Sequence, residues 1–291
     1  MNHPVGKGVF IWQLDKCAGG NPAELARQLA SLGFTWAAVK LANGMADFKP
    51  ELVGPAFEAL ALAGVSPWAW HYIYGGNIIT GASIAKQEAA AAVRNIQRFG
   101  PAGWIIDPEG EYKRKGAAGW ANTYMTAVRA AYPDLPIGLC SYRWPSYHPE
   151  LPWRDFTHYC DFHAPQVYWL KARNPGEQLR RSARELTAIR DLPVVPVGSA
   201  FAEHGWQPQP GELDEFDRTA QELGLPGVSW WCWDDHGLEE HPEYRARIKA
   251  HEWGTASEPH AVDIEDWAPE FDAWAREKIG YLGNWPKRKG K

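Results

Sequence analysis

The chain has 291 residues, 45% of them hydrophobic and 22% charged, so it can bury one barrel-sized core or two smaller ones. Its formal net charge of -5 gives no basic footprint for nucleic acid, although residues 286–291 form a short basic tail. Because no run of about 18 apolar residues occurs, we expect no membrane insertion.

The N-terminus, Met-Asn-His-Pro-Val-Gly-Lys, lacks the charged-then-apolar order of a secretory signal. We therefore expect synthesis in the cytoplasm, and leave release from the cell or association with a virion open. The four cysteines form no Cys-x-x-Cys pair, which argues against a zinc knuckle or a redox motif. Free buried thiols are expected instead.

Short β-type runs recur along the chain with helical segments between them. In order, they begin at Gly8, Trp36, Ser66, Gly103, Pro136, His163, Pro193 and Gly227. Asn21-Pro22 and Asn174-Pro175 each place a helix cap before a first-turn proline, with an acid three residues after the cap. Each helix then carries an apolar stripe that should face a sheet. The stripes are Leu25, Leu29 and Leu32 in the first helix and Leu179, Ala183, Leu186 and Ile189 in the second.

Eight strand and helix repeats over about 250 residues predict an α/β fold, a (β/α)8 TIM barrel. A doubly wound open sheet is the main alternative, but no Gly-x-Gly-x-x-Gly follows the first strand. We place the barrel at residues 1–253 and a C-terminal helical extension with the basic tail at 254–291. A helix over 266–279 carries Trp267, Phe271 and Trp274 on one side, for packing on the barrel or, alternatively, for docking to an assembly partner.

In such barrels the functional side chains lie where the strands end. Those we select as substrate-binding residues are Trp12, Lys40, His71, Tyr72, Tyr142, Gln166, Tyr168 and Trp231. Asp107 and Glu109 end the fourth run at alternate positions, so they share one face, and Glu111 lies beyond the strand in a loop. Asp234, after the eighth run, should face the same pocket.

Carboxylates among aromatic rings suit a sugar, which has apolar faces and a ring of hydroxyls. The 17 Trp residues favour the same ligand class. Asp234, Asp235 and His236 could be read as metal ligands, but neighbours on a strand point opposite ways, so we predict no metal and no cofactor. The apolar setting and the nearby carboxylate should raise the pKa of Glu109, as an acid catalyst requires.

Six motifs resemble, in order, the strand signatures of family 25 glycoside hydrolases, the lysozyme-type muramidases of bacteria and phages. They are Gly-Val-Phe-Ile-Trp-Gln from 8, Val-Lys-Leu-Ala-Asn-Gly from 39, Ala-Trp-His-Tyr from 69, Asp-Pro-Glu from 107, Ile-Gly-Leu-Cys-Ser from 137 and Trp-Trp-Cys-Trp-Asp from 230. The resemblance implies that Glu109 is the general acid, that Asp107 stabilises the transition state or orients an N-acetyl group, and that Asp234 is a supporting carboxylate.

Three positions depart from that family's pattern. Phe10 stands where the family has an aspartate, Asn43 where it has a glutamate, and Cys140 where it has a tyrosine. The leading interpretation is therefore a glycosidase that cleaves an amino-sugar polymer such as peptidoglycan. A barrel that binds a glycan or cell wall without cleaving it, within a phage or surface assembly, is the first alternative. A barrel hydrolase that uses the same two carboxylates on another substrate is the second.

Overall fold

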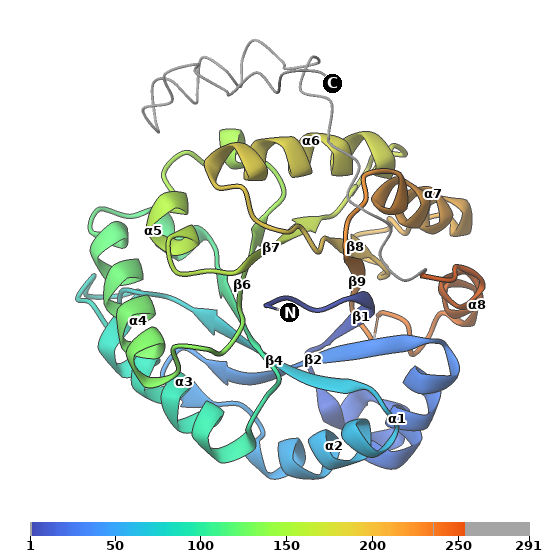
Figure 1. Cartoon of the computed structure of the whole chain (residues 1–291), viewed down its shortest axis with the longest axis horizontal. Coiled ribbons are helices and arrows are strands. Elements are labelled where there is room, and N and C mark those ends of the chain that lie inside the picture. Colours follow the sequence, from blue (N-terminus) through green and yellow to red (C-terminus); the bar gives the residue numbers. More distant parts are fainter. Residues whose placement is uncertain (1, 235, 254–291) are drawn as a thin grey trace, which may run out of the picture.

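Eight parallel strands close into a barrel in the computed structural model, which describes residues 2–234 and 236–253 (Figure 1). Closure follows from β1, which pairs with both β2 and β9. The barrel strands are β1 (Gly6–Ile11), β2 (Phe34–Asn43), β4 (Ser66–Ile73), β5 (Trp104–Pro108), β6 (Ile137–Tyr142), β7 (Phe162–Val167), β8 (Val197–Ser199) and β9 (Gly227–Trp231). The predicted TIM barrel is therefore confirmed. The short strand β3 (Ala46–Asp47) adds an antiparallel turn to the end of β2.

Helices surround the strands as an outer ring (Figure 1). They are α1 (Pro22–Ser31), α2 (Pro50–Leu62), α3 (Ala85–Phe99), α4 (Ala117–Ala131), α5 (Trp153–Thr157), α6 (Pro175–Ile189), α7 (Pro210–Glu222) and α8 (Pro242–Ala250). Short 3-10 helices follow three of the strands: η1 (Leu14–Lys16) and η2 (Ala18–Gly20), η3 (Gly110–Lys113), and η4 (Pro145–Tyr147). No helix in the described residues is long and apolar enough to cross a membrane.

Helices α1 and α6 begin at their prolines, as the sequence predicts. The Asn21 side chain caps α1 by accepting hydrogen bonds from the backbone N–H groups of Ala23 and Glu24. The predicted cap at Asn174 is wrong, because its side chain bonds to Glu177 and Gln178 instead of to the backbone. The apolar stripes of both helices face the strands, where most of their residues are buried.

The inside of the barrel is filled by large aromatic rings. Trp36, Trp68, Phe162 and Phe10 are all less than 5% exposed there. Glycines on the neighbouring strands make the room: a Cβ on Gly8 would lie 1.9 Å from the Trp36 ring. This packed aromatic layer forms an apolar floor below the carboxyl ends of the strands.

Strand register sets which side chains stand on this floor. Tyr72 of β4 lies opposite Asp107 of β5, and Tyr142 of β6 lies opposite Gln166 of β7. Side chains alternate along a strand. Residues two or four positions after an inward ring such as Trp68 or Phe162 therefore also point into the barrel. The polar residues at the strand ends are thus collected at one mouth of the barrel.

All four cysteines are buried, and Cys140 and Cys160 are free thiols, as expected from their spacing. The proposed extension at 254–291, with its predicted helix at 266–279, lies outside the described residues.

Candidate active site

Asp107 and Glu109 come together at the barrel mouth through one side chain of a distant strand. The amide nitrogen Nε2 of Gln166 donates to Asp107 Oδ1 at 2.9 Å and to Glu109 Oε1 at 3.0 Å. Since both oxygens lie within 3.0 Å of the same nitrogen, they are no more than about 6 Å apart. Gln166 thus fixes the spacing of the pair, in addition to any contact that it makes with a substrate.

Burial raises the pKa of both carboxyls. Asp107 is only 5% exposed, and its pKa lies well above the usual range, first because of burial and then because of the charge of Glu109. The pKa of Glu109 is raised by burial, with a smaller contribution from Glu111, as the sequence led us to expect. Gln166 acts in the opposite direction on both, since its N–H groups favour the charged forms.

Lys40 projects from β2 into a cage of aromatic rings beside Asp107. Its Nζ lies 4.7 Å from the ring centre of Trp70 and between 5.0 and 5.8 Å from those of Phe48, Tyr72 and Trp12. Burial lowers the pKa of Lys40 to about 8, although the Asp107 charge acts to raise it. The ammonium therefore has cation–π partners and a nearby carboxylate.

Glu111 belongs to the site as a third carboxylate. The 3-10 helix η3 turns the chain back after Glu109, so that Tyr72 donates to Glu111 Oε2 at 3.0 Å. The negative charge of Glu111 contributes to the raised pKa values of Asp107 and Glu109. We expected a loop residue outside the site. The alternation of three acids from 107 to 111 was the only signal in the sequence for its inclusion.

Tyr142 ends β6, and Lys40 lies on β2, on the opposite side of β5. A histidine and a lysine lie next to Tyr142. Its ring stacks on His148, with centroids 3.7 Å apart, and Lys113 Nζ lies 4.1 Å from the same ring centre. Lys113 also contacts His148 Nδ1 at 2.8 Å. Neither Lys113 nor His148 was selected from the sequence, because the short segments at η3 and after η4 that carry them have no recognisable pattern.

The remaining aromatic residues selected from the sequence line the same mouth. Trp12 is 41% exposed just after β1, and Trp231 is half-buried against Trp70, with ring centres 5.5 Å apart. Tyr168 is half-buried and packs edge-on against Phe201. Exposed indole faces at Trp12 can stack on the apolar face of a sugar ring.

His71 is not a pocket residue, which corrects the prediction. It alternates with Trp70 and Tyr72 on β4 and therefore points outward, where it is completely buried between the sheet and the helices. Its ring nitrogens bond to Tyr124 Oη at 3.0 Å and to the carbonyl oxygen of Gly44 at 2.8 Å. Burial lowers its pKa to about 4, so it is a neutral core residue at neutral pH.

Asp234 is fully buried, so it does not face an open pocket as we expected. Its Oδ2 accepts backbone hydrogen bonds from Trp12 at 2.6 Å and from Gln13 at 3.2 Å. The carboxylate thereby holds the turn that presents the exposed Trp12 ring. Its place in the structure supports a positioning role.

Phe10 occupies the position of the acid that the resemblance leads one to expect on the first strand. It is 1% exposed and contacts the rings of Trp36, Trp70 and Trp231, with centroids 6.1 to 6.3 Å apart. The site therefore has an apolar wall where a further carboxylate would otherwise stand. This wall adds to the desolvation that raises the pKa of Asp107.

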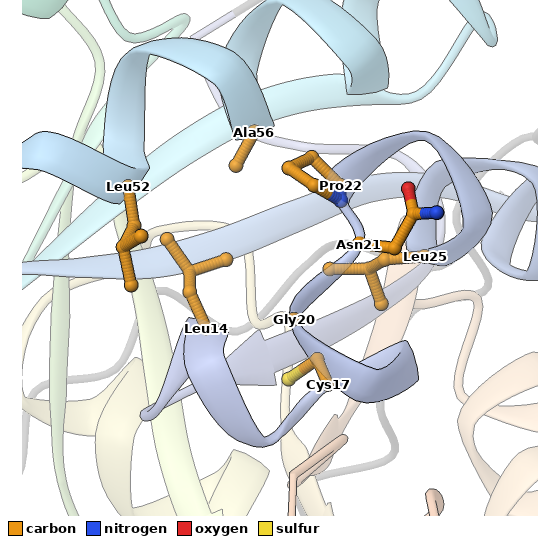
Figure 2. A pocket seen from close by; sticks show the side chains of 8 residues that line it. All are labelled: Leu14, Cys17, Gly20, Asn21, Pro22, Leu25, Leu52 and Ala56. Atoms are coloured by element: carbon orange, nitrogen blue, oxygen red, sulfur yellow. The ribbon is translucent and has the colours of Figure 1, made fainter.

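A small cavity lies away from these carboxylates, between the turn after β1 and helices α1 and α2 (Figure 2). Its volume is about 20 Å³, room for roughly one water molecule. Its lining is mostly apolar: Leu14, Cys17, Gly20, Asn21, Pro22, Leu25, Leu52 and Ala56. It is too small for a sugar. Nowhere in residues 2–234 and 236–253 do three or more His, Cys, Asp or Glu side chains form a group that could hold a metal ion.

No protein-family model matches the chain, and no curated protein matches its sequence. Solved structures do share its fold. An endo-1,4-β-D-mannanase from Thermotoga petrophila aligns over 85% of this chain and 99% of its own, with a TM-score of 0.62 and 8% identity. The spore cortex-lytic enzyme SleL of Bacillus megaterium aligns over 87% of this chain and 75% of its own, with a TM-score of 0.58 and 9% identity.

Active domain 2 of a chitinase from Pyrococcus furiosus is similar over 79% of this chain and 84% of its own. Its TM-score is 0.56 and its identity is 10%. At such low identities these likenesses establish the barrel fold. What the chain does with that fold has to be argued from its own site.

Proposed function

We propose that the protein is a glycoside hydrolase that cleaves an amino-sugar polymer such as peptidoglycan. The observation that carries the proposal is the carboxyl pair of Asp107 and Glu109, held by Gln166 at the carboxyl ends of the strands above a layer of aromatic rings. Glycosidases use two such carboxyls, one of which must be protonated near neutral pH. The order of strand motifs that resemble family 25 glycoside hydrolases supports the proposal.

In the proposed reaction Glu109 donates its proton to the glycosidic oxygen as the bond breaks. It is the more exposed member of the pair, so it can reach a bond that a substrate on Trp12 presents, and its raised pKa keeps the proton available. Asp107 lies deeper, where burial favours its neutral form, so it would orient an N-acetyl group while water adds to the sugar carbon and returns a proton to Glu109. Asp107 Oδ1 and Glu109 Oε1 are at most about 6 Å apart. This leaves little room for an attacking water between the two carboxyls, so we expect the configuration at the sugar carbon to be retained.

Similarity to known structures is consistent with this class of substrate. A spore cortex-lytic enzyme and a chitinase in complex with chito-oligosaccharides both share the barrel. The muramidase type is proposed on the strength of the strand motifs alone.

The test is release of reducing ends from purified peptidoglycan by the wild-type protein and by Glu109→Gln. We expect the substitution to lower the rate at least about 100-fold, the usual contribution of a general acid, and to leave wall binding intact. Glu58→Gln, at an exposed position on α2, is the matched control and should keep full activity. Equal rates for wild type and Glu109→Gln would contradict the proposal.

One observation favours a second function, a glycan-binding barrel without hydrolysis. Phe10 removes an acid that the resemblance places near the pair, and its ring is built into the core. Wild-type protein that binds walls between pH 4 and 8 but releases no reducing ends would support that function.

A further inference from the structure

Three cations, Lys113, Arg143 and Arg181, are here named the cationic cluster. Arg143 and Arg181 lie over the Trp144 ring at 4.4 and 4.1 Å, and Lys113 contacts His148 at 2.8 Å. Lys113 and Arg143 both act on His148, whose pKa falls to about 4, mainly through burial and then through these two charges. Lys113 is also close enough to Glu109 to lower its pKa. Through Lys113 the cluster thus acts on the group that we propose as the proton donor.

Two cations of the cluster, Arg143 and Lys113, form no salt bridge among the described residues, whereas Arg181 pairs with Glu185. Arg143 is half-buried and lies over the Trp144 ring at 4.4 Å, but it has no carboxylate or hydrogen-bond partner among the described residues. Its pKa is lowered by burial and by the charge of Arg181. Lys113 bonds to the neutral His148 ring, not to a carboxylate.

The acids near Arg143 leave its charge without a partner. Glu185 is committed to Arg181 and Ser146, with bonds of 2.8 to 2.9 Å. Glu150 is fully exposed and only partly offsets the other charges at His148. Half-buried cations without partners are costly in a protein unless a ligand supplies the anion.

We infer that the cationic cluster is a subsite for a carboxylate carried by the glycan, so that the substrate is an acidic polymer. The inference rests on the proposed function and narrows its substrate class. The planar fork of Arg143 suits bidentate binding of a carboxylate, and the Lys113 ammonium adds a second charge from η3. An acidic substituent held there would also contact Lys113, whose charge acts on Glu109.

The experiment compares two forms of one substrate. Peptidoglycan freed of phosphate polymers is used as such or after its carboxyl groups are amidated with a carbodiimide and ammonia. For the wild-type protein we expect amidation to lower kcat/KM at least about 10-fold, the loss of one or two charge-assisted hydrogen bonds. Arg143→Gln should show a similar loss on the untreated substrate and little further response to amidation.

Arg218→Gln, at an exposed position on α7, is the control and should respond to amidation like the wild type. Lys113→Gln is a second variant, in case Arg143→Gln fails to fold by circular dichroism. Equal cleavage of both substrates by the wild type would overturn the acidic subsite and leave the hydrolase proposal standing.

Binding of the two substrate forms to the Glu109→Gln protein tests the acidic subsite independently of the hydrolase proposal. If the wild type cleaves neither substrate but Glu109→Gln binds the carboxylate form at least about 10-fold more tightly, the subsite stands and hydrolysis fails. If it binds both forms equally, the subsite fails whatever the activity.

Discussion

The ring of Phe10 packs against the ring of Trp231 inside the barrel, with centroids 6.1 Å apart and planes inclined at 51°. These rings come from β1 and β9, the strands whose pairing closes the barrel. The contact makes Phe10 part of the floor on which Asp107 stands, so the first strand contributes apolar surface to the site in place of charge.

Phe10→Asp should therefore destabilise the protein without restoring a typical carboxylate. Removing a buried aromatic ring costs about 3–5 kcal/mol, and the new carboxyl would be buried among the rings of the lumen. Denaturant titration should show a lower free energy of unfolding, and Phe10→Leu, which keeps apolar bulk, should lose less. A stable Phe10→Asp protein with increased hydrolysis would show instead that the lumen can accommodate the acid.

Gln166→Met should alter the pH dependence of hydrolysis. Methionine keeps most of the side-chain volume but removes the N–H groups that lower the pKa values of Asp107 and Glu109. We expect the basic limb of the pH–rate profile to move to higher pH, and kcat to fall roughly 10- to 100-fold as the pair loses its spacing. A profile that keeps its wild-type midpoints would mean that Gln166 does not control the ionisation of the pair.

Asp107→Asn should stabilise the protein at neutral pH. A carboxyl whose pKa is higher in the folded than in the unfolded chain holds its proton more tightly when folded, so stability falls as the pH rises from the unfolded toward the folded pKa. Between those values Asp107 costs up to about 1.4 kcal/mol for each pH unit, and the amide removes that cost.

The measurement is the free energy of unfolding of wild type and Asp107→Asn at pH 4 and pH 7. The variant's advantage should be small at pH 4 and larger at pH 7. Asp217, a second buried acid with a raised pKa, lies on α7 and should contribute the same pH dependence to both proteins. An advantage that stays constant with pH would contradict the raised pKa of Asp107.

The sequence was sufficient to predict the barrel, because strand-type runs and helical segments alternate along the whole described chain. It also predicted the pair at 107 and 109, since alternation on a strand is a local property. The same rule argues against His71 as a pocket residue. His71 is adjacent to the inward-pointing Tyr72, and neighbours on a strand point to opposite faces.

What the sequence did not reveal are contacts between distant strands. The bridge from Gln166 to Asp107 spans 59 residues, and the return of Glu111 toward Tyr72 depends on the turn made by η3. Asp234 likewise resembles a pocket carboxylate until its bonds to the backbone at Trp12 are known. Each of these depends on tertiary geometry that no local pattern encodes.

Asp234→Asn provides a test of that positioning role. The amide can keep one acceptor oxygen for Trp12 and Gln13, and it removes a buried charge whose pKa burial raises, so stability at neutral pH should change little. If Asp234 acts by holding the Trp12 turn, KM should rise more than kcat falls, and Trp12→Ala should have a similar kinetic effect. A large loss of kcat at unchanged KM would instead indicate that Asp234 acts on the reacting bond, as the family resemblance implies.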